Sequence, residues 1–308
     1  MTGGENRRME YDVRQSVRKY DRALKRIHLI HLAINRSVCI TACLLLVISG
    51  YALYDSQRLY ADASAQNFKI YDPEEYGPDA LAGLQAQNPD VIGWIHVNDT
   101  RIDYPLLQCA DNQTYLTTNA KGEYSASGSI YMDCRNTGTL SEAVTILYGH
   151  YMQNDAMFGG IGRFTDSTYF AEHMYGQIYI GEEAYGIEFF ALAVTDAYDE
   201  TIYDPDAESA ASAAAYLYAN ALQSAGITIG TNDRLVLLST CTADMTTKRY
   251  VLAGRLSEEL HLKEEQTGGG GAAAPGRAVR IAACAAAGIA VLLFVLAVRR
   301  QKHPPDAC

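Results

Sequence analysis

The sequence lacks the signatures of several protein classes. Its seven cysteines include no C-x-x-C pair and its seven histidines have no metal-ligand spacing, so we predict no metal and no other cofactor. Basic residues are outnumbered, with 25 against 36 acidic ones, and the net charge of −11 argues against nucleic acid as a partner. Wholesale disorder is also excluded, because 48% of the residues are hydrophobic and can bury a core.

Apolar runs long enough to cross a membrane occur near both ends. Residues 37–54 carry no charge and follow a segment with nine basic and four acidic residues, and residues 278–298 carry one charge. A helix needs about 20 apolar residues to span the hydrocarbon core. Because short loops rich in Lys and Arg stay cytoplasmic, we expect the N-terminus inside the plasma membrane and the acidic middle of the chain outside it.

Each apolar run has a second interpretation. The first could be a signal peptide cut near Ala63 or Ala65, where small residues have the required spacing, although the basic region before it is unusually long for a signal peptide. The second could be a buried or peripheral helix, since its alanine-rich half is weakly apolar. We favour a retained anchor at each end.

Composition divides the chain into segments. Gly268 to Gly271 and the alanines after them indicate a flexible linker, so the globular domain should end before it. The predicted segments are a basic cytoplasmic segment (1–36), a transmembrane helix (37–54), a helical stalk (55–84), a globular domain (85–262), the linker (263–277), a second transmembrane helix (278–298) and a cytoplasmic tail (299–308).

The globular domain is predicted to be mainly β. Short β-rich runs recur between turn residues, a spacing that favours a barrel or a sandwich. One alanine-rich stretch, residues 206–225, has helical spacing and is followed by Gly226, so a helix should precede the last two strands; it either packs on the sheet or takes part in substrate recognition. The predicted strands are 91–97, 127–133, 143–149, 177–181, 186–195, 234–240 and 249–256.

Three reactive side chains stand at the ends of these strands. Cys241 follows the apolar run LVLLST, Arg249 begins the next strand, and His150 follows Gly149 at the end of another. A thiol is a nucleophile only as thiolate, which an imidazole can generate, and a guanidinium can hold an oxyanion, so together they favour acyl transfer. Taken singly, each residue has a structural interpretation: a small buried hydrophobe, a surface histidine and a solvated charge.

These residues lie in strings that resemble the motifs of sortases, the membrane-anchored cysteine transpeptidases of Gram-positive bacteria. The resemblance is greatest to class B, and the order His, Cys, Arg along the chain fits it. The strings are LLSTC (237–241), KRYVLAGRL (248–256), YGHYM (148–152), NPDVIGWIHVNDTRIDYPLLQ (88–108), DNQTYL (111–116), GSIYMDCRN (128–136) and MFGGIGRF (157–164).

The resemblance implies an eight-stranded sortase-like β-barrel with a long helix before the last two strands, flanked here by N- and C-terminal transmembrane helices. It implies Cys241 as nucleophile, His150 as acid/base and Arg249 as the oxyanion and substrate-positioning group. Arg255 is an alternative arginine on the same strand face, but only Arg249 is near the rim. The residues implied to bind substrate are Asn112, Leu116, Tyr148 and Ser239.

The resemblance also implies partners. The substrate would be an exported protein with an NPxTx or LPxTG-like sorting motif, and the acceptor an amine of a peptidoglycan precursor or a pilin lysine. Two anchors are more typical of pilus-building class C sortases than of class B. A catalytically inactive binding or assembly module on the same barrel is the alternative, because fold does not guarantee function. Cys109 and Cys134 are expected outside the cell, either paired or free.

Overall fold

The computed structural model describes residues 3–203, 209–242 and 247–260. The predicted linker (263–277), second transmembrane helix (278–298) and cytoplasmic tail (299–308) lie outside the described residues. The described residues form the N-terminal helix and the folded domain after it.

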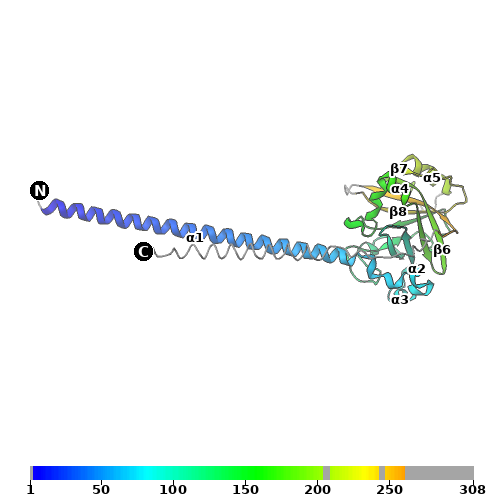
Figure 1. Cartoon of the computed structure of the whole chain (residues 1–308), viewed down its shortest axis with the longest axis horizontal. Coiled ribbons are helices and arrows are strands. Elements are labelled where there is room, and N and C mark those ends of the chain that lie inside the picture. Colours follow the sequence, from blue (N-terminus) through cyan, green and yellow to red (C-terminus); the bar gives the residue numbers. More distant parts are fainter. Residues whose placement is uncertain (1–2, 204–208, 243–246, 261–308) are drawn as a thin grey trace, which may run out of the picture. The chain divides into compact units, whose positions relative to one another are not determined.

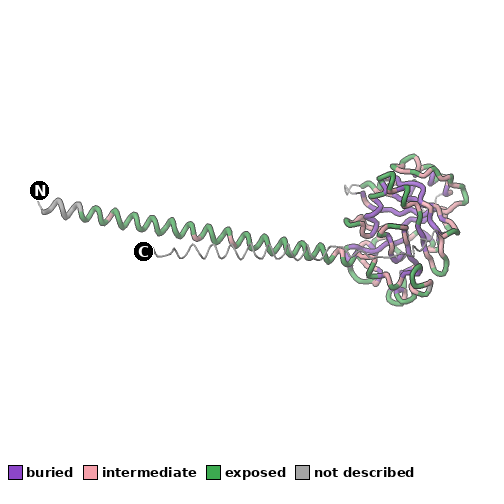
Figure 2. Tube along the Cα trace, in the orientation of Figure 1, coloured by how far each residue is buried: buried purple, intermediate pink, exposed green. Residues whose placement is uncertain are grey.

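The chain begins with one long helix, α1 (Gly3–Asp62), of 60 residues. It is exposed along most of its length, as the green tube in Figure 2 shows. An 18-residue window within it has a mean hydropathy of 2.0 and no buried share, so among the described helices this one is long and apolar enough to cross a membrane. At about 1.5 Å per residue the helix is about 90 Å long, which exceeds a hydrocarbon core of about 30 Å.

The folded domain is an eight-stranded closed β-barrel, with a ninth short strand added to it. The barrel order is β5-β1-β2-β3-β4-β8-β9-β6, β5 pairs with β6 to close it, and β7 pairs with β6. Two of the neighbouring pairs, β2 with β3 and β4 with β8, are parallel. The strands are β1 (Val91–Val97), β2 (Asp103–Leu107), β3 (Ile130–Met132), β4 (Val144–Tyr148), β5 (Tyr175–Ile180), β6 (Glu183–Asp196), β7 (Ala221–Ser224), β8 (Leu235–Cys241) and β9 (Lys248–Ser257).

The helix before the last two strands is present but shorter than predicted. Helix α5 (Ala210–Ala219) ends at the cap Asn220, and the predicted start at 206–208 lies outside the described residues. Residues 221–224, predicted as helix, form β7 instead, because they pair with β6 and alternate between half-buried and exposed. Two strands, β2 and β7, were not predicted from the sequence.

The sheet between β4 and β9 is buried on both faces. Val236 and Leu238 of β8 pack in the cluster that contains β1 and β2 side chains, whereas Leu235 and Leu237 pack with α5 through Leu217. A strand covered on both sides reads as a continuous apolar run, which is why LVLLST is so apolar. Figure 1 shows α5 at the top of the folded domain and α2 and α3 at its bottom.

Short helices after α1 cover another part of the barrel surface. Phe68, Leu81 and Leu84 pack against Trp94 of β1, and Tyr104 of β2 donates its hydroxyl hydrogen to the carbonyl of Ala63 at 3.0 Å. Part of the segment predicted as a stalk is therefore docked on the barrel. These helices are η1 (Ala65–Asn67), η2 (Lys69–Tyr71), α2 (Pro73–Tyr76), η3 (Pro78–Leu81) and α3 (Ala82–Gln85).

A charge cluster fixes this docked segment to the barrel. Lys69 Nζ donates to Asp72 and, at 3.0 Å, to Asp103 of β2. The Asp103 carboxylate also accepts from Trp94 Nε1 at 2.8 Å and lies 3.3 Å from His96 Nδ1. Burial by itself raises the pKa of Asp103, but hydrogen bonds from His96, Trp94 and Lys69 outweigh burial and lower that pKa from 3.8 to about 2.

Replacing Asp103 by Asn should destabilise the folded domain by about 2 kcal/mol at pH 7. The folded-state pKa of Asp103 is depressed, so its contribution is complete above the unfolded-state value near 4 and is lost as the pH falls from about 4 to about 2. Guanidinium unfolding, followed by the fluorescence of Trp94, measures the difference, which should narrow below pH 4. Asp79→Asn, an exposed change in the same segment, is the control and should stay within about 0.5 kcal/mol of wild type. Equal stability of Asp103→Asn and wild type at pH 7 would contradict this account.

Candidate active site

The parallel pairing of β4 and β8 brings His150 and Cys241 to the same edge of the barrel. Tyr148 is paired with Ser239 in this ladder, and the backbone N–H of Gly149 donates to the carbonyl of Ser239 at 3.2 Å. His150 is two residues beyond Tyr148, and Cys241 is two residues beyond Ser239. The two side chains thus occupy equivalent positions at the carboxyl ends of adjacent strands, and both residues are half-buried.

Arg249 is brought to Cys241 by the antiparallel pairing of β8 and β9. Cys241 and Arg249 are direct partners in this ladder. Directly opposite residues project from the same face, with Cβ atoms about 4.5–5.5 Å apart. Arg255 is instead opposite Leu235 at the other end of β8 and forms an ion pair with Glu188. Of the two arginines considered from the sequence, Arg249 is therefore the one beside the thiol.

The imidazole of His150 is oriented by a backbone carbonyl. Its Nε2 lies 2.8 Å from the oxygen of Leu116, at the end of the short helix η4 (Thr114–Leu116). A carbonyl only accepts hydrogen bonds, so Nε2 carries the hydrogen and Nδ1 is the basic nitrogen of the neutral ring. Asn112, just before this helix, accepts from the backbone N–H of Cys134 at 2.8 Å through its side chain. Leu116 thus borders His150, whereas Asn112 of the same segment contacts Cys134.

The other two residues expected to bind substrate, Tyr148 and Ser239, take part in internal contacts. The Tyr148 ring lies between those of Tyr131 and Tyr203, with centroid distances of 5.4 and 6.3 Å. Ser239 is only 2% exposed, and its hydroxyl is 2.8 Å from that of Tyr203. Burial raises the pKa of Tyr203, while its hydrogen bonds with Ser239 and Thr195 and the positive charge of Arg249 act in the opposite direction. Ser239 therefore has a buried side chain whose hydroxyl contacts Tyr203.

The chain is similar to known proteins of one family. No family model matches the chain. Sortase B of Listeria monocytogenes serovar 1/2a is 33% identical over 182 residues, which cover 58% of this chain and 74% of that protein. The chain belongs to the sortase family. A class B sortase of Streptococcus pyogenes involved in pilus biogenesis superimposes with a TM-score of 0.54 at 31% identity, covering 57% of this chain and 97% of that one.

A second solved structure gives the same class. A mutant form of Clostridium perfringens sortase B has a TM-score of 0.58 at 28% identity, covering 62% of this chain and 95% of that one. This sortase is thus class B-like, and the predicted family and barrel are confirmed. Sortases are cysteine transpeptidases, which confirms the predicted enzyme class.

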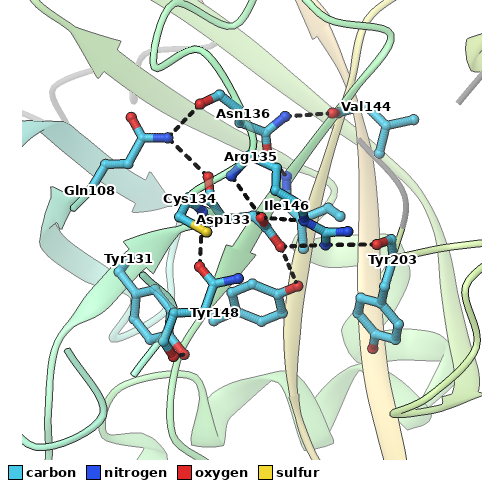
Figure 3. A network of polar contacts seen from close by, with 11 residues as sticks. Gln108, Tyr131, Asp133, Cys134, Arg135, Asn136, Val144, Ile146, Tyr148 and Tyr203 are labelled. Atoms are coloured by element: carbon cyan, nitrogen blue, oxygen red, sulfur yellow. Dashed lines mark hydrogen bonds and ion pairs between the residues drawn. The ribbon is translucent and has the colours of Figure 1, made fainter. Parts of the chain in front are cut away.

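The sequence did not reveal a polar network beside the tyrosines of this sortase (Figure 3). The carboxylate of Asp133, directly after β3, is fully buried and accepts hydrogen bonds from Arg135 and from the hydroxyl of Tyr148. Burial alone raises the pKa of Asp133, but these bonds from Arg135 and Tyr148 outweigh burial and hold that pKa below its ordinary value. Asp133 lies in the string GSIYMDCRN, which resembles sortases, yet nothing in the string indicated a role for its carboxylate.

No metal-binding cluster is present in the part of this sortase that the structure describes: no three His, Cys, Asp or Glu side chains come together there. The Cys109, Cys134 and Cys241 thiols are all free and half-buried. The candidate active site lies at the ends of β4, β8 and β9, with Leu116 beside His150.

Gly149 permits the close packing that sets the direction of the chain at His150. A Cβ atom built on Gly149 would lie 2.5 Å from Ile130 Cδ1 and 2.7 Å from Phe158 Cδ2, both in the barrel core. Gly149→Ala should therefore destabilise the domain by about 1–3 kcal/mol and lower the transpeptidase activity by displacing the imidazole. Thermal unfolding and initial rates measure the two effects. Gly230→Ala, where the nearest atom would be 3.7 Å away, is the control. Wild-type stability of Gly149→Ala would contradict the packing argument.

Proposed function

We propose that this sortase cleaves a sorting motif of the NPxTx or LPxTG-like type after its threonine and transfers the acyl group to an amine. The observation that supports this most is the convergence of three strand ends, which bring Cys241, His150 and Arg249 to one edge of the barrel. An imidazole, a thiol and a guanidinium in one place are the groups that acyl transfer through a thioester requires.

In the proposed reaction, the Cys241 thiolate attacks the threonine carbonyl carbon and the C–N bond of the scissile peptide breaks. His150 holds the thiol proton and gives it to the departing amine. Arg249 stabilises the negative charge on the carbonyl oxygen, where one such donor contributes about 2.7–4 kcal/mol. An incoming amine then attacks the thioester, loses a proton to His150 and releases Cys241 as thiolate. The incoming amine belongs to a peptidoglycan precursor or to a pilin lysine.

Four residues are proposed to bind the sorting motif: Asn112, Leu116, Tyr148 and Ser239. Leu116 is best supported, since its carbonyl oxygen lies 2.8 Å from His150 Nε2 and its half-buried side chain packs against the same hydrophobic cluster as Tyr148. Tyr148 adds an aromatic ring directly before Gly149. Ser239 would act through Tyr203, because its own side chain is buried.

The N-terminal helix is proposed to anchor the enzyme, with residues 37–54 in the plasma membrane and the barrel outside the cell. Nine basic residues before the apolar run support this orientation. Carbonate washing of membranes should leave the full-length protein in the pellet, and protease added to intact cells should remove the barrel. Release of the protein by carbonate, or protection of the barrel in intact cells, would refute the anchor or its orientation.

A peptide panel tests the proposed activity. The full-length protein in detergent is incubated with fluorogenic pentapeptides of the two motif types, with and without hydroxylamine as a strong amine acceptor. We expect cleavage after threonine and, with hydroxylamine, a peptide hydroxamate detected by mass spectrometry. Absence of cleavage across the panel, together with no covalent thioacyl adduct on Cys241, would exclude the proposal and favour a binding module.

A further inference from the structure

The carboxylate of Asp133 is the centre of a fully satisfied buried polar group (Figure 3). One oxygen accepts from the backbone N–H and the Nε of Arg135, each at 2.9 Å. The other accepts from Arg135 Nη2 at 2.7 Å and from the Tyr148 hydroxyl at 2.9 Å. The Asp133 side chain has no exposed surface, whereas that of Arg135 is 52% exposed. A buried carboxylate with four donors has one well-defined position.

This group is connected to the strand that ends at His150. Tyr148 is the last residue of β4, its hydroxyl is held by Asp133, and only Gly149 separates it from His150. Its ring is also held between Tyr131 and Tyr203. Rotation or withdrawal of Tyr148 would therefore move the backbone that carries the imidazole.

The same group is connected to the strand that ends at Cys241. Besides binding Asp133, Arg135 Nη2 donates to the backbone carbonyl of Tyr203 at 2.8 Å. The Tyr203 hydroxyl in turn is 2.8 Å from Ser239 Oγ, two residues before Cys241 on β8. One ion pair thus reaches both strand ends of the candidate active site, which lie far apart along the chain.

We propose that Asp133 and Arg135 are positioning residues, which hold Tyr148 and Tyr203 and through them fix His150 and Cys241 relative to each other. Neither residue of the pair touches the thiol or the imidazole, so their effect on the reaction is indirect. A buried ion pair contributes little net stability compared with apolar packing, but it fixes geometry, which suits this location. The inference rests on the proposed roles of His150 and Cys241.

The test measures the reactivity of Cys241 in the full-length protein without any peptide. Iodoacetamide alkylation of Cys241 is followed by mass spectrometry, which separates this thiol from the other six. The variants are Asp133→Asn, which removes the charge at constant shape, Tyr148→Phe, which removes only the hydroxyl, and the double variant. Glu188→Gln is the matched control, because it breaks the Glu188–Arg255 ion pair between β6 and β9.

We expect Asp133→Asn to slow Cys241 alkylation about fivefold, because a displaced imidazole supplies less thiolate. Tyr148→Phe should slow it to a similar extent, and the double variant should be no slower than Asp133→Asn, since both changes break one connection. Glu188→Gln should alkylate at the wild-type rate. With a cleavable peptide, kcat should fall with the alkylation rate while KM changes less than about twofold.

Several outcomes would overturn the inference. Unchanged alkylation in Asp133→Asn would show that the pair does not position the site, and faster alkylation would indicate local unfolding. Additive effects in the double variant, or equal slowing in Glu188→Gln, would reduce the pair to a general structural role. His150→Ala separates the two proposals: if it slows alkylation but wild type cleaves no peptide, the proposed function fails while the positioning role can still be measured.

Discussion

Replacing Cys241 by Ala should abolish cleavage of the sorting peptide, with a loss of at least about 10³-fold in kcat/KM. The thiol is the one group of the proposed reaction that forms a covalent bond to the substrate, and the alanine methyl group offers no nucleophile in its place. Since Cys241 is half-buried at the end of β8, its truncation should leave the barrel folded. Initial rates with the fluorogenic peptide, together with thermal unfolding, measure both properties.

Cys109→Ala is the matched control. Cys109 is also a free, half-buried thiol, and its Sγ contacts the carbonyl of Asp111 in the loop before Asn112. Activity of this variant should stay within about twofold of wild type, and its melting temperature should stay close to that of Cys241→Ala. Turnover retained in Cys241→Ala and lost in Cys109→Ala would assign the nucleophile to the other thiol.

Arg249→Lys should lower kcat/KM about 10²–10³-fold, although the positive charge is kept. The guanidinium presents a planar fork of donors, whereas an ammonium is a point charge on a flexible stem and cannot hold the same oxyanion geometry. Arg249 is directly opposite Cys241 in the β8–β9 ladder, so the two side chains project from the same face of the sheet. Most of the loss should appear in kcat, because the oxyanion exists only during the reaction.

Arg255→Lys tests whether activity requires an arginine at position 249 or only an arginine somewhere on β9. Arg255 is on β9 as well, but its register partner is Leu235 and its ion-pair partner is Glu188, away from the thiol. We expect nearly full activity from this variant, with at most a small loss of stability. If Arg255→Lys were the inactive variant and Arg249→Lys the active one, the proposed oxyanion group would be wrong.

Strands buried on both faces or bounded by turn residues were predictable from the sequence. The prediction of 91–97 coincides with β1, and that of 234–240 differs from β8 by one residue at each end. β2 was missed because it contains Pro105, which normally argues against a strand with neighbours on both sides. The structure accommodates this proline because β3 pairs with β2 only at Leu106 and Leu107.

The end of α5 could not be predicted from local sequence. Alanine-rich residues continue beyond Asn220 with no proline or glycine until Gly226, so the helical spacing of the sequence persists past the end of the helix. Residues 221–224 nevertheless form a strand, because they pair with β6 at Ala191 to Ala193, beyond the residues of β6 that pair with β5. A partner far away in the chain overrides the local preference for a helix.

The meeting of His150, Cys241 and Arg249 was inferred from strand ends and from the sortase resemblance, and their roles stay a prediction. The network around Asp133 was not foreseeable in this way. Asp133, directly after β3, accepts a hydrogen bond from Tyr148, and its partner Arg135 donates to the carbonyl of Tyr203. The Tyr203 hydroxyl in turn is hydrogen-bonded to that of Ser239. Such contacts depend on which strands become neighbours, and no periodicity in the sequence encodes that information.

The placement of β8 between β4 and β9 has a consequence for biosynthesis. The ribosome makes β4 early and β8 and β9 last among the strands, so a nascent chain carries its imidazole long before its thiol. A polypeptide that stops before Lys248 would contain Cys241 but lack Arg249. Its β8 would have no β9 partner, and this unpaired strand edge would be prone to self-association. Under the proposed mechanism, activity therefore requires β9, and prematurely terminated products should be inert and aggregation-prone.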